Sequence, residues 1–171
     1  MRLYMVITSQ IESWQNGGVY GLAVLFLSGA LDVWIFVRTD CPISNRYAPT
    51  IARLNAVPGV KLLLVYPEPG VSQQAVDAHR EAFGLRGIPA VLDAKLALVR
   101  KAGVRVTPEA VVFGDGQRVL YRGRIDDRQA SLRVAQMPRK KDLEEAIGDG
   151  LAGRLLKLRV TKAVGCAVEG L

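Results

Sequence analysis

The stretch Phe36-Val37-Arg38-Thr39-Asp40-Cys41-Pro42-Ile43-Ser44-Asn45-Arg46-Tyr47-Ala48-Pro49 decides how this chain is interpreted. The apolar residues 33–37 predict a buried strand that ends just before Cys41, and residues 45–55 have the apolar spacing of a helix. A cysteine at this junction lies near unpaired backbone N–H groups and the positive end of the helix dipole. Both stabilise the nucleophilic thiolate, so we expect Cys41 to be reactive. The alternative is an inert cysteine that serves as a small buried apolar side chain.

Charged neighbours act on the Cys41 thiol in opposite directions. Asp40 opposes thiolate formation, whereas Arg38 and Arg46 favour it, and the sequence does not say which effect prevails. His79 is far from Cys41 in the sequence and is expected at the surface. No cysteine–histidine pair is therefore predicted.

The composition is that of one globular domain. The chain has 171 residues, 50% hydrophobic and 23% charged, with a formal net charge of +7. Basic residues are mostly interspersed with acidic ones, which argues against a nucleic-acid interface. Two cysteines and one histidine cannot supply four protein ligands to a structural zinc ion without carboxylates. We expect neither a metal site nor a bound cofactor.

Strand and helix patterns alternate after residue 32, which is typical of a layered α/β fold. Ser72 and Asp93 are expected to cap helices, Gly103 to end one, and Asp115-Gly116 to mark a hairpin. The expected strands cover residues 33–37, 60–66, 88–92, 110–113 and 118–122. The expected helices cover residues 45–55, 72–83, 94–102 and 142–152.

The chain divides into an N-terminal extension (residues 1–30), a central domain (31–153) and a C-terminal tail (154–171). Residues 13–31 carry no charge, and Ser28-Gly29-Ala30 resembles a signal cleavage site, but the basic segment that precedes an export signal is poor. We favour an extra strand or hairpin over an export signal. The protein is then cytoplasmic, and periplasmic or secreted if residues 13–31 do act as a signal.

Cys41 and Pro49 carry a family resemblance. They resemble the active-site segment of thioredoxin-like proteins, in which a strand leads into Cys-x-x-Cys and a helix with proline eight residues after the first cysteine. Ser44 stands in place of the second cysteine; it can donate a hydrogen bond to a thiolate but cannot resolve a mixed disulfide. The element order over residues 31–152 is similar to the redoxin branch, which includes the alkyl hydroperoxide reductase/thiol-specific antioxidant superfamily. The resemblance implies a thioredoxin-like fold with a central mixed sheet, flanking helices and an inserted strand–helix unit before the final hairpin.

A second landmark of the family is Val106-Thr107-Pro108-Glu109-Ala110. The resemblance implies a cis Thr107–Pro108 bond that faces Cys41 across a shallow groove, with the Thr107 backbone pairing with a partner's extended segment. A trans proline that opens an edge strand is the alternative. Pro42, Thr107 and Pro108 are thus candidate substrate-binding residues.

Residues 121–128, Tyr-Arg-Gly-Arg-Ile-Asp-Asp-Arg, follow the last expected strand near the rim of this groove. Arg124 is a candidate for holding an anionic substrate or the thiolate, and Gly123 for letting a partner chain approach. Arg46 completes the substrate-binding candidates. The alternative is a solvated, self-paired charged loop, which we favour for Asp126, Asp127 and Arg128.

Cys166 is the candidate resolving thiol. Thirteen extended residues from Arg154 to Cys166 reach up to about 43 Å, against roughly 21 Å for the last helix, so a return to Cys41 is possible. Gly165 would allow a close approach, and an inert tail cysteine is the alternative. The segments Cys-Pro-Ile-Ser-Asn-Arg-Tyr, Tyr-Arg-Gly-Arg-Ile-Asp-Asp and Val-Gly-Cys are similar to those of a group of redoxin-domain proteins, which supports a role for the tail.

Three functions follow from these residues. The first is a thiol–disulfide oxidoreductase in which Cys41 attacks a protein or small-molecule disulfide, and Cys166 or an external thiol resolves the product. The second is an antioxidant peroxidase, although the peroxiredoxin motif Pro-x-x-x-Thr-x-x-Cys fails at Trp34 and Arg38. The third is a redox-inactive binding module, which requires an ordinary Cys41 pKa and no disulfide. The oligomeric state is not specified by the sequence.

Overall fold

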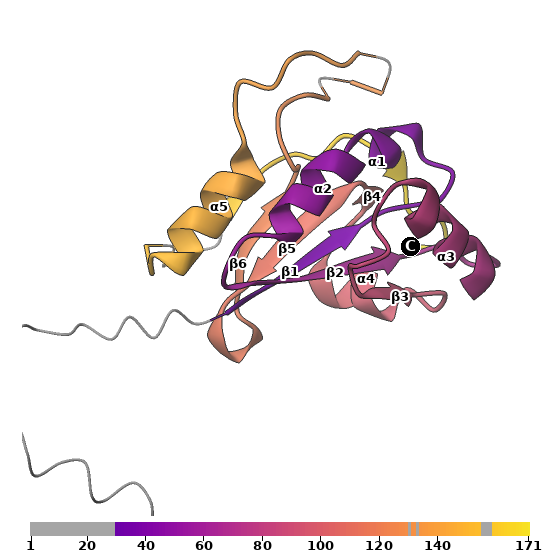
Figure 1. The fold of residues 1–171 in the computed structure, drawn as a ribbon, viewed down its shortest axis with the longest axis horizontal. Coiled ribbons are helices and arrows are strands. Elements are labelled where there is room, and N and C mark those ends of the chain that lie inside the picture. Colours follow the sequence, from indigo (N-terminus) through magenta and orange to yellow (C-terminus); the bar gives the residue numbers. More distant parts are fainter. Residues whose placement is uncertain (1–29, 130, 133, 155–158) are drawn as a thin grey trace, which may run out of the picture.

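A central mixed sheet organises the molecule (Figure 1). The computed structural model describes residues 30–129, 131–132, 134–154 and 159–171; the extension predicted at residues 1–30 lies almost wholly outside them. Within the described residues the sheet has six strands in the order β3-β2-β1-β5-β6-β7. Its strands are β1 (Leu31–Phe36), β2 (Val60–Tyr66), β3 (Ala90–Leu92), β5 (Glu109–Phe113), β6 (Val119–Gly123) and β7 (Arg159–Val160).

Strand β1 lies at the centre of the sheet, parallel to β2 and antiparallel to β5. Its alternating side chains serve two cores, because successive residues of a strand point to opposite faces. Val33 and Ile35 join the first core, whereas Phe36 joins the second and Trp34 packs against it. Burial on both faces explains why this strand has an almost continuous apolar sequence.

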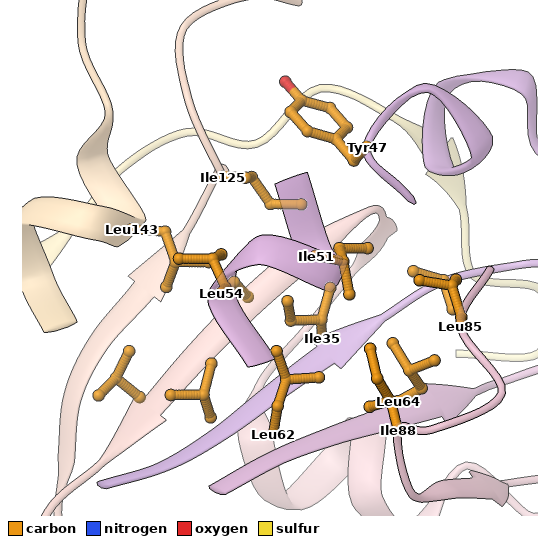
Figure 2. Packing of buried hydrophobic residues seen from close by; sticks show 14 of the residues in the cluster. Ile35, Tyr47, Ile51, Leu54, Leu62, Leu64, Leu85, Ile88, Ile125 and Leu143 are labelled. Atoms are coloured by element: carbon orange, nitrogen blue, oxygen red, sulfur yellow. The ribbon is translucent and has the colours of Figure 1, made fainter. Parts of the chain in front are cut away.

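Five helices flank the sheet in the described part of the chain: α1 (Pro42–Arg46), α2 (Ala48–Asn55), α3 (Gln73–Ala82), α4 (Ala97–Ala102) and α5 (Asp142–Leu151). Helices α2 and α5 cover one face, where Ile51, Leu54 and Leu143 pack against Ile35 and Leu62 (Figure 2). Helix α4 covers the other face.

The helix predicted over residues 45–55 begins earlier, at Pro42, and is divided at Tyr47 into α1 and α2. Pro49 explains the division, because it has no N–H to donate to a carbonyl in the preceding turn. Pro42 is tolerated in the first turn, where backbone N–H groups have no partner in the helix. Cys41 therefore occupies the N-cap position of α1.

The predicted helix caps are present, with one shift. The Ser72 hydroxyl accepts a hydrogen bond from the Ala75 N–H (3.2 Å), and Gly103 ends α4 in the left-handed region. Helix α4 begins at Ala97 rather than residue 94, because a turn with a left-handed Leu96 precedes it. The Asp93 carboxylate bridges this turn and accepts from the N–H groups of Ala97 (2.8 Å) and Val99 (2.9 Å).

The C-terminal tail, described over residues 159–171, returns to the end of the sheet where Cys41 lies (Figure 1). Strand β7 extends the sheet by pairing parallel to β6. Strand β8 (Cys166–Ala167) then pairs antiparallel with β4 (Val106–Thr107). None of the helices in the described ranges has the length and apolar character to cross a membrane.

Candidate active site

Cys41 lies where the central strand gives way to the first helix. Strand β1 ends at Phe36, residues 38–40 form a short loop, and the Cys41 carbonyl accepts the first hydrogen bond of α1 from the Asn45 N–H (3.0 Å). The side chain is only 1% exposed and belongs to the first core. Pro42, the next residue, is exposed at the start of α1.

The Thr107–Pro108 segment lies beside this sulfur. The Thr107–Pro108 peptide bond is cis, the isomer that the family resemblance implies. The Thr107 carbonyl oxygen lies 3.5 Å from Cys41 Sγ, and Thr107 itself is fully buried. The loop and the cysteine, separated by 66 residues in the sequence, thus form one site.

Cys166 meets Cys41 across this site. Strand β8 pairs Cys166 with Thr107, and this pairing places the two Sγ atoms 2.7 Å apart. A small side-chain movement would bring them to the bonding distance of about 2.05 Å. Gly165 permits the approach, because a Cβ atom there would overlap the Thr107 carbonyl.

The two thiols have opposite pKa shifts. Burial raises the pKa of Cys41, but hydrogen bonds from the Cys166 thiol, the Ser44 N–H and hydroxyl, and the Ile43 N–H more than offset it, so this pKa lies below its ordinary value. Burial and the hydrogen bond to Cys41 raise the pKa of Cys166 to about 11. Of the two thiols, Cys41 is therefore the one that loses its proton more readily.

Ser44 supports the site from within α1. Its side chain is buried, and its oxygen accepts a long hydrogen bond from the Arg38 N–H (3.4 Å). Ser44 is also one of the groups that lower the pKa of Cys41. The Arg38 guanidinium itself binds Asp40 (3.0 Å) and Glu169 (3.1 Å).

Glu68 positions the loop before Cys41, and the sequence analysis did not identify it. Its buried carboxylate accepts from the Thr39 N–H (2.7 Å) and hydroxyl (2.9 Å). The contact depends on the register of the sheet, in which β1 and β2 are parallel with Phe36 opposite Val65. Thr39 lies three residues after Phe36 and Glu68 three residues after Val65, which brings them together at the same edge.

His79 is not a surface residue, contrary to the sequence-based expectation. It is buried, with its Nε2 2.9 Å from Asn45 Oδ1 and its Nδ1 3.0 Å from the Tyr66 hydroxyl. Burial lowers the pKa of His79, which favours the neutral ring. The ring therefore links α3 to α1 and β2 rather than acting at Cys41.

The charged segment after β6 is only partly the solvated loop that we expected. Asp126 and Arg128 do pair (3.3 Å), but Asp126 is buried and accepts a 2.6 Å hydrogen bond from the Tyr47 hydroxyl. The reason is that the first residues of this segment pack under α2, where Ile125 joins the first core.

The remaining substrate-binding candidates have other contacts. Arg124 pairs with Asp142 at the start of α5 (2.8 Å). Gly123 has φ +150°, and a Cβ there would overlap the Thr161 side chain, so this glycine accommodates the chain's own tail. Arg46 is exposed, and its carbonyl accepts from Arg128 (3.4 Å). None of these contacts directs the three residues toward Cys41.

No group of three or more histidine, cysteine, aspartate or glutamate side chains suited to a metal ion occurs among the residues that the structure describes. The chemistry available at the site is that of the two sulfur atoms. A thiolate hydrogen-bonded to a second thiol can exchange with an external disulfide or be oxidised to an internal one.

Comparisons with known proteins bear on the fold. Neither the protein-family models nor the curated proteins gave a match. An uncharacterized conserved protein from Geobacillus kaustophilus has a similar structure (TM-score 0.72, 19% identity, 83% of this chain and 78% of that one). So has a hypothetical protein from Sinorhizobium meliloti 1021 (TM-score 0.69, 21% identity, 84% and 81%).

A third similar structure, from Chlorobium tepidum, is provisionally designated thiol:disulfide interchange protein DsbE (TM-score 0.55, 17% identity, 72% of this chain and 82% of that one). The identities are low, so the likeness concerns the fold. The helix-flanked mixed sheet, with the β3–α4 unit before the β5–β6 hairpin, is the architecture that the family resemblance implies. This chain therefore has the thioredoxin-like fold.

Proposed function

We propose that the protein is a thiol–disulfide oxidoreductase in which Cys41 is the nucleophile and Cys166 the resolving thiol. The observation that carries the proposal is the 2.7 Å separation of two sulfur atoms that are 125 residues apart in the sequence. The designation of the Chlorobium tepidum structure as a thiol:disulfide interchange protein is consistent with it.

The first step is attack of the Cys41 thiolate on one sulfur of a partner disulfide. The partner's S–S bond breaks, a Cys41–partner bond forms, and the partner's other sulfur leaves as a thiolate that takes up a proton. The hydrogen bonds from Ser44 and the Ile43 N–H, which do not depend on the tail, favour the nucleophilic form of Cys41. Ser44 and the backbone N–H groups of α1 hold that thiolate in place.

The second step is resolution by Cys166. Its thiol loses a proton and attacks Cys41 Sγ, which forms the Cys41–Cys166 bond and releases the partner's second thiolate. The partner is reduced by two electrons and the chain is oxidised by two. Once Cys41 is bonded to the partner, its negative charge no longer raises the pKa of Cys166, which eases this deprotonation.

A redox-inactive binding module requires an ordinary thiol and no disulfide, whereas here a second sulfur atom lies 2.7 Å from Cys41 Sγ and the pKa of Cys41 is lowered. Peroxide reduction has less support. The position of the peroxiredoxin threonine is occupied by Arg38, whose guanidinium binds Asp40 and Glu169. We therefore favour exchange with a disulfide.

The test compares the full chain with its Cys41→Ser and Cys166→Ser variants in the reduction of a small aromatic disulfide. We expect Cys41→Ser to lose at least 100-fold in rate, because the nucleophile is gone. Cys166→Ser should accumulate a Cys41 mixed disulfide, visible by mass spectrometry, that the wild type does not retain. Non-reducing peptide mapping of the oxidised wild type should show the Cys41–Cys166 bond. Unchanged turnover in Cys41→Ser would rule the mechanism out.

A further inference from the structure

Strand β8 carries the proposed resolving thiol and also covers Cys41, the proposed nucleophile. Cys41 is 1% exposed, and Cys166, in β8, is the side chain that lies against its sulfur. Disulfide exchange requires the partner's sulfur to reach this atom. A partner polypeptide can do so only after β8 has moved away.

The same movement would expose a short strand edge beside Cys41. Strands β4 and β8 form a two-stranded sheet of their own, apart from the main sheet, within the described residues. The Arg105 carbonyl accepts from the Val168 N–H (3.0 Å), and the Thr107 hydroxyl lies 3.5 Å from the Cys166 carbonyl. When β8 leaves, these groups lose their partners and can pair with another extended chain.

The tail is weakly enough held to leave. Strand β8 has two residues, and Val168 is the buried aliphatic side chain that anchors it to the second core. The Arg38–Glu169 ion pair at its end adds little, because the Glu169 side chain is 75% exposed. Segments with few buried contacts open at a small fraction of the free energy of global unfolding.

The contacts of the tail with β4 also show which residues a bound segment needs beside this strand. Gly165 lies so close to Thr107 that any Cβ would overlap the Thr107 carbonyl. A segment that places its own cysteine against Cys41 therefore needs glycine immediately before that cysteine. An acidic residue three positions after the cysteine would meet Arg38, as Glu169 does.

We propose, building on the function proposed above, that the partner is a polypeptide with an extended Gly-Cys segment that pairs with β4 in place of β8. The tail strand β8 and the partner's strand then pair with β4 in turn. The partner's strand binds, its cysteine forms the mixed disulfide with Cys41, and the returning tail both delivers Cys166 and displaces the partner's strand. Resolution and product release are one movement.

The test uses the full chain with Cys166→Ser, in which Cys41 is the remaining cysteine of the two. The probe is the peptide Ala-Val-Gly-Cys-Ala-Val-Glu, the sequence of residues 163–169, joined through its cysteine to thionitrobenzoate. Attack by Cys41 transfers the peptide to Cys41 and releases the coloured thionitrobenzoate anion. A matched peptide has valine in place of glycine. We expect the glycine peptide to react at least 10-fold faster; equal rates would contradict the proposal.

A second pair of variants tests the competition from the tail. Gly165→Ala, added to Cys166→Ser, should unseat β8 and raise the rate with the glycine peptide at least 5-fold. Gly87→Ala is the matched control, because a Cβ there has no atom within 4 Å and its φ is not positive. Equal rates in the two double variants would mean that β8 does not occupy the partner's place.

A third measurement detects the displacement of β8 without the Gly165→Ala substitution. Hydrogen exchange of the Val168 amide, bonded to the Arg105 carbonyl, should rise at least 10-fold when the peptide is attached to Cys41 of the Cys166→Ser chain. Unchanged protection would overturn the strand exchange. If Cys41 reacts with a small disulfide but does not distinguish the peptides, the exchange of strands at β4 is wrong and the proposed oxidoreductase function still stands. If Cys41 of the folded chain reacts with no disulfide, the proposed function fails with it.

Discussion

At the scale of single residues, the site depends on how one buried sulfur can still ionise. Burial alone would keep the Cys41 thiol neutral. Three kinds of donor oppose it: the N–H groups at the start of α1, the Ser44 hydroxyl and the Cys166 thiol. Ser44 takes the position of the second cysteine in the family motif, and Cys166 supplies a thiol from the other end of the domain.

This arrangement predicts a shift in the pH dependence of Cys41 when Cys166 is replaced. The Cys166 hydrogen bond lowers the pKa of Cys41, so removing the donor in Cys166→Ala should raise that pKa. The midpoint of Cys41 alkylation by iodoacetamide, followed by mass spectrometry from pH 5 to 10, should therefore move to higher pH. In the wild type the midpoint should lie below the ordinary thiol value of 9.0. A midpoint that stays in place would remove Cys166 from the ionisation of Cys41.

At the scale of elements, local sequence signals and tertiary contacts contribute differently. Helix α3 begins where its N-cap Ser72 predicts. Helix α4 is only six residues long and begins after a left-handed Leu96, so its first turn depends on the buried Asp93 carboxylate. That carboxylate accepts two backbone hydrogen bonds and holds α4 over the second core.

The two caps should therefore differ in their contribution to stability. Asp93→Ala leaves two N–H groups without their acceptor, one of them buried, and should lower the free energy of unfolding by about 2 kcal/mol or more. Ser72→Ala removes one exposed hydrogen bond and should cost about 1 kcal/mol or less. Urea denaturation of both variants measures the difference. Equal losses would mean that α4 does not depend on Asp93.

At the scale of the whole molecule, the tail links the two ends of the domain. It adds β7 to the edge of the main sheet and then carries β8 to the Thr107–Pro108 loop. Thr161 anchors the turn between them, with its hydroxyl 2.6 Å from that of Tyr121 and 3.2 Å from the Arg124 N–H. A disulfide at Cys166 would close a loop that includes nearly the whole described domain.

Oxidation should consequently stabilise the fold. A Cys41–Cys166 bond spans 125 residues, and restricting a loop of that length in the unfolded chain is worth up to about 5 kcal/mol. We expect a higher urea midpoint for the oxidised than for the reduced wild type. Cys166→Ser should show no such dependence on oxidant. A reduced form as stable as the oxidised one would contradict the expectation.

The sequence by itself determined most of the elements and the position of Cys41 in the fold. Apolar periodicity, the Cys41–Pro49 spacing and the Thr107–Pro108 pair are local signals, and they sufficed for the thioredoxin-like fold and for placing Cys41 at the start of a helix. Only the tertiary structure decided the burial of His79, the anchoring of Thr39 by Glu68 and the pairing of β8 with β4. These features depend on which strands lie side by side. The length of the tail sets only the maximum distance that Cys166 can reach and does not specify the strand with which the tail pairs.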